Sequence, residues 1–105
     1  MSVLVLVTHD RGRLEAASLQ AITLARGLSG PVAALIAGED GAALAAEAGR
    51  FGAASVSIAT GEAFSEYAPG AWAAAVVALV ERSAPAVVVA PGTQRGNEVL
   101  ASVAA

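Results

Sequence analysis

Four short apolar runs recur along the chain and constrain its fold more than any other feature. They read VLVLV, VAALIA, SVSIA and AVVVA, and they begin at residues 3, 32, 55 and 86. Consecutive runs therefore start 29, 23 and 31 residues apart, which is the length of one strand–helix–strand unit. Ala-rich stretches separate the runs. The pattern predicts a repeated βαβ arrangement in which all strands run parallel.

The stretches between the runs predict helices at residues 13–28, 41–50 and 67–83, and a fourth helix that begins at Asn97. In each, apolar residues recur at the spacing of one helix face. The inward positions are Leu14, Ala17, Ala21, Ile22, Ala25, Leu28, Leu44, Ala48, Trp72, Val76, Leu79, Val80, Val99, Leu100 and Val103. Gly30 and Pro31 end the first helix. Trp72 falls on this spacing, so we expect it in the core.

Right-handed crossovers and one reversal of winding direction give the strand order 3-2-1-4. The fold class is therefore α/β, a Rossmann-like three-layer parallel sheet with helices on both faces. Residues 3–7 are continuously apolar, as in a strand covered on both faces, whereas residues 55–58 alternate as in a half-buried edge strand. The fourth run lies at the other edge but reads like a central strand. An unpaired apolar edge invites another strand, so we expect a further segment or a partner chain beside it.

The 105 residues suffice for a single α/β domain. The helical pattern that begins at Asn97 is still running at Ala105, without a C-cap signal. Together with the unpaired fourth strand, this favours the hypothesis that residues 1–105 are the incomplete N-terminal domain of a longer subunit.

Charge and composition exclude several classes of function. Nine acidic residues stand against six basic residues, all of them Arg, so the formal charge is −3. We therefore expect no nucleic acid or anionic membrane partner. The chain has no Cys and one His, which excludes thiolate metal sites and does not favour a His-based one. No stretch reaches the roughly 20 apolar residues of a spanning helix, and the first residues lack a signal peptide's basic region. We expect no membrane insertion and a cytoplasmic location.

In open parallel sheets, ligands bind beyond the carboxyl ends of the strands at the switch point, here between the first and fourth strands. The crevice candidates in the two loops that meet there are Thr8, His9, Asp10, Gly92, Thr93, Arg95 and Gly96. Helix N-termini attract anions, and Arg binds phosphate, so a phosphate or adenylate site is one interpretation. The other is a plain turn, in which Thr93 or Asn97 caps the helix and Arg95 is solvated. No glycine-rich phosphate fingerprint is present.

Two pairs of residues have a structural interpretation beside a chemical one. His9 and Asp10 invite a catalytic hypothesis, but no Ser or Cys nucleophile motif accompanies them. We expect Asp10 to cap the turn before the first helix. Glu39 and Asp40 follow the second run, where an acid binds ribose in dinucleotide folds. Without the glycine fingerprint, we expect them to cap the second helix, and we predict no catalytic residue.

Several segments, taken in order, match the pattern of one known family. The first of these is the opening strand Ser2–Val7, followed by His9 and Asp10. The second is the helix at residues 14–28. The strand at residues 32–38 and the Ala-Pro-Gly-Thr segment with Gly96 follow. In this order and spacing, nearly the whole chain resembles the N-terminal domain of the electron transfer flavoprotein α subunit.

The resemblance implies an adenine-nucleotide-hydrolase-like fold and a role in assembly rather than catalysis. In that family, a second α/β domain carries most of the FAD contacts. The α and β subunits form a heterodimer, which carries electrons from dehydrogenases, including those of fatty acid β-oxidation, to the respiratory chain. FAD is therefore expected in the full subunit but not in this fragment. The expected partners are the β subunit and the missing C-terminal domain, with self-association through the edge of the fourth strand as an additional expectation.

An alternative is a stand-alone nucleotide-binding module of the universal-stress type, which has a related architecture. That family shows a Gly-x2-Gly-x9-Gly-Ser/Thr run after a late strand. Gly92 and Gly96 have one residue too many between them for this run. The module stays an alternative that nucleotide binding would favour.

Overall fold

The computed structural model describes the chain except for residues 1, 11–12, 29, 39–40, 61–63 and 65–67. Its elements follow one another in ten short segments. They are β1 (Val3–Val7), β2 (His9–Asp10), β3 (Arg13–Leu14), α1 (Ala16–Arg26), β4 (Val32–Ala37), α2 (Gly41–Arg50), β5 (Ser55–Ala59), α3 (Pro69–Ser83), β6 (Val87–Val89) and α4 (Gln94–Ala104).

Four strands form one parallel sheet in the spatial order β5-β4-β1-β6. Counted along the chain, these are the third, second, first and fourth apolar runs, so the predicted order 3-2-1-4 is confirmed. Val3 of β1 lies opposite Val32 of β4 and Val87 of β6. The short strands β2 and β3, which the sequence did not predict, form a separate antiparallel hairpin.

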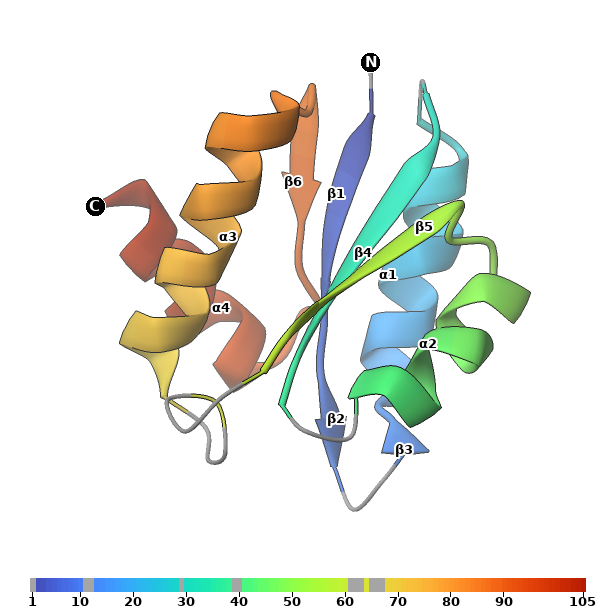
Figure 1. Cartoon of the computed structure of the whole chain (residues 1–105), viewed down its shortest axis with the longest axis horizontal. Helices are drawn as coiled ribbons and strands as arrows, with labels where there is room; N and C mark the ends of the chain where they lie inside the picture. The colour runs from blue at the N-terminus through green and yellow to red at the C-terminus, as the bar shows by residue number, and fades with distance from the viewer. Residues whose placement is uncertain (1, 11–12, 29, 39–40, 61–63, 65–67) are drawn as a thin grey trace.

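Helices cover both faces of this sheet (Figure 1), which confirms the three-layer fold class. One core lies between the sheet and helices α1 and α2, and a second lies between the sheet and helices α3 and α4. Strand β1 contributes to both cores: Val3, Val5 and Val7 belong to the first, and Leu4 and Leu6 belong to the second. Because β1 is buried on both faces, it is continuously apolar.

The first helix is shorter than its apolar spacing predicts. The prediction placed it over residues 13–28, but α1 spans Ala16–Arg26, so the prediction is wrong at both ends. Leu14 lies in β3 and fills the first core from a strand. Leu28 lies beyond the helix and is 39% exposed. Both residues fit the apolar spacing of the helix, so the spacing alone did not exclude them. At the start, the backbone pairing of β3 with β2 keeps Leu14 out of the helix.

The start of α1 is marked by a main-chain hydrogen bond rather than by a side-chain cap from its N-cap residue. Asp10 lies in β2, where its backbone pairs with Arg13. Its side chain is not among the described ones, so the expectation that it caps the turn before this helix stays a prediction. Glu15 occupies the N-cap position and makes no cap hydrogen bond through its side chain. Its backbone N–H donates to the carbonyl of Thr8 at 3.0 Å. A main-chain bond to the end of β1 therefore fixes the start of the helix.

The second and third helices follow the prediction closely. Helix α2 spans Gly41–Arg50 as predicted, with Leu44 and Ala48 in the first core. Helix α3 begins at Pro69, where a proline costs no helix hydrogen bond. Trp72 is buried in the second core, as predicted. Three positions named in the predictions for these helices lie outside the described residues: Glu39, Asp40 and Tyr67.

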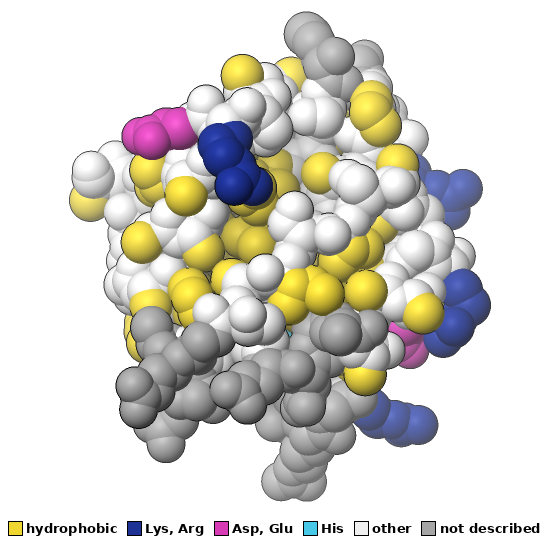
Figure 2. Space-filling view, viewed as in Figure 1, with side chains coloured by type: hydrophobic (Ala, Val, Ile, Leu, Met, Phe, Trp, Pro, Cys, Tyr) yellow, Lys and Arg dark blue, Asp and Glu magenta, His cyan; other side chains and the backbone are white. Residues whose placement is uncertain are grey.

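The described sheet ends in two different edges, which we call the β5 edge and the β6 edge. Both strands were predicted as edges, and both predictions are confirmed. The β5 edge alternates serines with apolar residues, and its Ile58 is 37% exposed. The β6 edge consists of three valines, and its Val87 is 42% exposed. Figure 2 shows the β5 side of the molecule, where apolar side chains gather in a hollow between α3 and β5.

Candidate functional site

The loops predicted to form a ligand crevice follow two neighbouring strands. Thr8 follows β1, and Pro91 and Gly92 follow β6, which pairs with β1. Because the carboxyl ends of parallel strands lie at the same edge of a sheet, the two loops leave it side by side. The question is whether their polar groups are available to a ligand.

Thr8 is fully buried, and its polar groups bind Ser18 on α1. The backbone N–H of Thr8 donates to Oγ of Ser18 at 2.8 Å, and Oγ1 of Thr8 lies 3.0 Å from the same oxygen. Both residues are 0% exposed. Buried polar groups are costly unless they are hydrogen-bonded, so each residue satisfies the other. Thr8 therefore links β1 to α1 and is closed to a ligand in this structure.

The ring of His9 fastens the turn after β1 to the end of β4. Its Nε2 lies 2.7 Å from the carbonyl oxygen of Ala37. A carbonyl only accepts, so Nε2 carries the hydrogen and donates it. Gly38 follows with φ of +120°, and a Cβ there would lie 3.0 Å from Nε2 of His9, so both the backbone and the ring favour glycine. This geometry gives His9 a structural role.

The turn after β6 is built as a helix cap. Oγ1 of Thr93 accepts a hydrogen bond from the backbone N–H of Gly96 at 3.1 Å, and α4 begins at Gln94. The predicted start at Asn97 is therefore wrong, whereas the interpretation in which Thr93 caps the helix is confirmed. The cap uses one of the N–H groups that would otherwise attract an anion. Arg95 is exposed in the first turn of α4.

The two glycines of this turn have different surroundings. Gly96 is buried, and a Cβ built on it would overlap the carbonyl oxygen of Pro91. Glycine at this position allows α4 to pack closely against the end of β6. Gly92 is exposed, and no atom of the described residues lies within 4 Å of a Cβ placed on it. Gly96 therefore serves packing, while Gly92 lines the open surface beside it.

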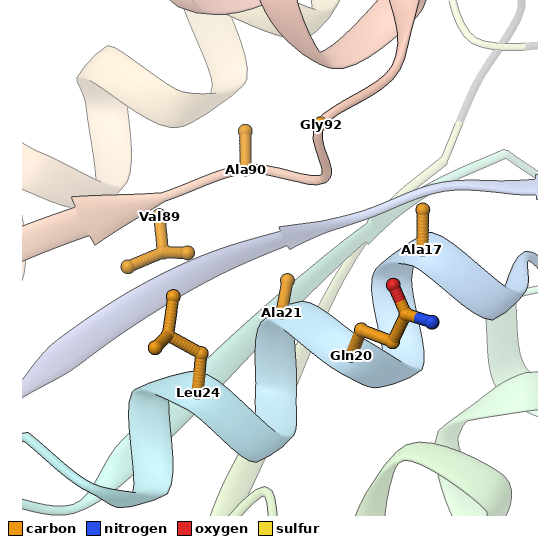
Figure 3. A pocket seen from close by; sticks show the side chains of 7 residues that line it. All are labelled: Ala17, Gln20, Ala21, Leu24, Val89, Ala90 and Gly92. Atoms are coloured by element: carbon orange, nitrogen blue, oxygen red, sulfur yellow. The ribbon is translucent and has the colours of Figure 1, made fainter.

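A groove of about 310 Å³ lies between α1 and β6, next to this turn (Figure 3). It is lined by Ala17, Gln20, Ala21, Leu24, Val89, Ala90 and Gly92. Ala21 and Leu24 point from α1 toward Val89. Leu24 is 64% exposed, and Gln20 supplies the polar side chain of the lining. The groove is lined by uncharged residues, and its exposed surface is as polar as it is apolar.

The described residues of this groove do not fit FAD or a nucleotide phosphate. A pyrophosphate needs several hydrogen-bond donors, but the lining offers one amide side chain, and the N–H of Gly96 is bonded to Thr93. Across the described residues, no group of three or more His, Asp or Glu side chains gathers to hold a metal ion. The groove therefore offers an uncharged surface of mixed polarity rather than a cradle of side-chain donors.

Sequence reasoning missed the α1 side of this site. Ser18 lies on the buried stripe of α1 with Ile22 and Ala25. A serine on the buried face of a helix needs a hydrogen-bond partner, and this signal was present in the sequence. Leu24 lies off that stripe, so its position indicates an apolar residue directed away from the core. That Leu24 points toward Val89 of β6, however, is seen only in the three-dimensional structure (Figure 3).

Comparison with known proteins assigns the chain to a family. The family model described as the electron transfer flavoprotein domain matches residues 3–105. No curated protein matches the sequence. Among the helices that the structure describes, none is long and apolar enough to span a membrane. The match covers all the described strands and helices, and the chain therefore belongs to the electron transfer flavoprotein domain family.

Proposed function

We propose that the chain is the N-terminal domain of an electron transfer flavoprotein α subunit and that it acts by assembly. In this proposal, FAD is bound elsewhere in the assembled protein, in the C-terminal domain of the subunit. The chain provides a docking surface for that domain and for the β subunit, and it is part of an electron carrier rather than a catalyst. Family membership supports electron transfer as the process. The cytoplasmic location and the link to fatty acid β-oxidation stay predictions.

The observation that carries this proposal is the exposed β6 edge. Its three residues are valines, and Val87 is 42% exposed. In the described part of the chain, β6 pairs with β1 alone. Proteins protect a free edge strand with charged residues, prolines or bulges, and the three valines provide none of these. Such an edge favours an added strand.

The backbone of β6 indicates how an added strand would bind. The N–H of Ala86 donates to the carbonyl of Ser2 at 2.8 Å, so Ala86 faces the β1 side. Backbone groups of successive residues in a strand point to opposite sides, so Val87 and Val89 direct their N–H and C=O groups outward. Val89 also packs against the first core. A strand added at the β6 edge would therefore form hydrogen bonds and extend that core.

The groove beside the edge adds an uncharged surface to it. Leu24 of α1 is 64% exposed and faces Val89. None of the residues that line the groove is charged, which agrees with the depletion of charged residues at the centres of protein interfaces. The exposed apolar side chains of Leu24 and Val87 support an interaction surface on this side. An assembly role therefore accounts for both the β6 edge and the groove.

Co-expression of the chain with an electron transfer flavoprotein β subunit tests this proposal. Sedimentation velocity is expected to show a complex, and Val87→Lys is expected to weaken it about tenfold or more, because it places a charge at the centre of an apolar interface. Ser57→Lys, on the β5 edge, is the matched control and should leave the complex unchanged. Absorbance spectra of the isolated chain are expected to show no flavin. A chain that binds no β subunit, or that purifies with stoichiometric flavin, would contradict the proposal.

A further inference from the structure

We propose that the slot between β5 and α3 is a second docking site, which takes an extended acidic segment of a partner polypeptide. This slot lies on the opposite side of the sheet from the β6 edge, and the inference is independent of the function proposed above. Its volume is about 180 Å³. It is lined by Leu35, Ser57, Ile58, Ala59, Ala75, Ala78, Leu79 and Arg82.

The slot exists because α3 presents small side chains to the sheet at this point. Ala75, Ala78 and Arg82 recur at the spacing of one helix face, and all three line the slot. Two alanines leave space that a larger side chain would fill. Leu35, which is 2% exposed, is among the sheet residues of the lining. Figure 2 shows the resulting hollow, with a basic side chain above the apolar surface.

The backbone of β5 makes the slot suitable for an extended chain. The N–H of Ala54 donates to the carbonyl of Val32 at 2.7 Å, so Ala54 faces β4. By alternation along the strand, Ser55 and Ser57 direct their N–H and C=O groups away from β4. As far as the chain is described, β5 pairs with β4 alone. An extended segment can bind such an edge through main-chain hydrogen bonds, with its side chains entering adjacent pockets.

Arg82 selects the charge of that segment. It lines the slot from the C-terminal end of α3, and no carboxylate of a described residue forms an ion pair with it. The neighbouring Glu81 lines a different hollow, with Gly70 and Ser102. Arg82 is therefore the charged residue of the slot lining. A guanidinium group can bind a carboxylate with two hydrogen bonds, so an acidic side chain flanked by small apolar residues complements this surface.

A nuclear magnetic resonance titration with a synthetic peptide tests the inference. The probe is acetyl-Thr-Val-Glu-Val-Thr-amide, added at up to millimolar concentration to the nitrogen-15-labelled chain. The largest amide shifts are expected at Ser55 and Ser57. Arg82→Gln is expected to weaken binding about fivefold, as for the loss of one partly exposed ion pair. Arg50→Gln, which changes an exposed Arg at the end of α2, is the matched control and should leave the affinity unchanged.

Two further measurements separate this inference from unspecific binding. Replacing Glu by Gln in the peptide should weaken binding to the wild-type chain as much as Arg82→Gln does. Ser57→Pro removes an outward N–H, which an edge strand tolerates, and it should abolish binding while the circular dichroism spectrum stays unchanged. The inference is overturned if the β5 amides do not respond, if shifts appear only at Val87 and Val89, or if the Glu and Gln peptides bind equally well.

Discussion

The two edges of the sheet have the same local topology but different chemistry. Each strand is parallel to its one described neighbour. The β5 edge carries serines at positions 55 and 57, and Arg82 lies beside it. The β6 edge is made of valines, and Leu24 lies beside it. Serine side chains can hydrogen-bond to water at an exposed edge, whereas valine side chains are shielded from water only when another segment packs against the edge. The comparison teaches that two edges of one small sheet can share their topology and still differ in polarity.

The largest expected effect concerns the close packing that supports the β6 edge. Gly96→Ala places a Cβ against the carbonyl of Pro91 and is expected to lower the free energy of unfolding by about 2–3 kcal/mol. The matched control is Gly49→Ala in α2, the helix that packs beside β5. A Cβ added at Gly49 meets no atom of the described structure within 4 Å. This control should raise the free energy of unfolding by up to about 1 kcal/mol. Urea denaturation measures the free energy of unfolding of both variants. If both substitutions changed it in the same direction, the contrast between the β6 side and the β5 side would not hold.

The next effect concerns the buried hydrogen bonds that position α1 beside the β6 edge. Ser18→Ala leaves the buried N–H of Thr8 without its acceptor and is expected to cost about 2 kcal/mol. The control is Ser83→Ala in α3, whose exposed Oγ donates to the carbonyl of Leu79 at 2.6 Å. Water can replace that bond, so a change below about 0.5 kcal/mol is expected. If Ser18→Ala and Ser83→Ala shifted the urea midpoint equally, burial would not distinguish the hydrogen bond beside β6 from the exposed one in α3.

A smaller effect concerns the helix starts that follow the two edge strands. Helix α4 follows β6 and has a side-chain cap from Thr93, whereas α3 follows β5 and has Ala68 at its N-cap position without one. Thr93→Ala should therefore lower the free energy of unfolding by about 1 kcal/mol. Ala68→Asp should raise it by about 1 kcal/mol, since an aspartate at this position can bond a free N–H. Thermal denaturation tests both, and destabilisation by Ala68→Asp would contradict the assignment of that cap.

The smallest effect on stability sharpens the comparison of the edges themselves. Val87→Thr and Ile58→Thr each replace a partly exposed apolar residue, and each should change the free energy of unfolding by less than about 0.5 kcal/mol. Light scattering as a function of concentration is expected to separate them. Val87→Thr should reduce self-association, because it makes the β6 edge more polar, whereas Ile58→Thr should have no effect. The same scattering curve for both variants would contradict a special role of the β6 edge.

The sheet could be predicted from the sequence because its signals are both local and repeated. Apolar runs at the spacing of βαβ units, the handedness of crossovers and one reversal of winding direction together predict the strand order. The start of α1 could not be predicted in the same way. Leu14 satisfies the apolar spacing of a helix, yet it fills the core from the β2–β3 hairpin. The apolar pattern of a short segment therefore does not reveal whether its backbone is a helix or a strand.

The candidate site was less predictable, because the same residue types serve packing and binding. A threonine after a strand can bind a phosphate, but Thr8 is closed by Ser18. A glycine before a helix can leave room for a ligand, but Gly96 leaves room for Pro91. In both cases the deciding partner lies elsewhere in the chain. The groove beside Leu24 depends on the distance between α1 and β6 in space, for which the sequence holds no direct signal.

The bond between the His9 ring and Ala37 has a consequence for the direction from which other molecules can approach. This bond and the β2–β3 hairpin lie beyond the carboxyl ends of β1 and β4, at the rim where parallel sheets commonly admit small molecules. Described residues of the chain therefore occupy the part of the rim beside β1 and β4. If the two proposed docking sites are both used, macromolecules approach within the plane of the sheet, from its two opposite flanks, and two of them can be held at the same time. The domain would then act as a bridge between neighbours in a row.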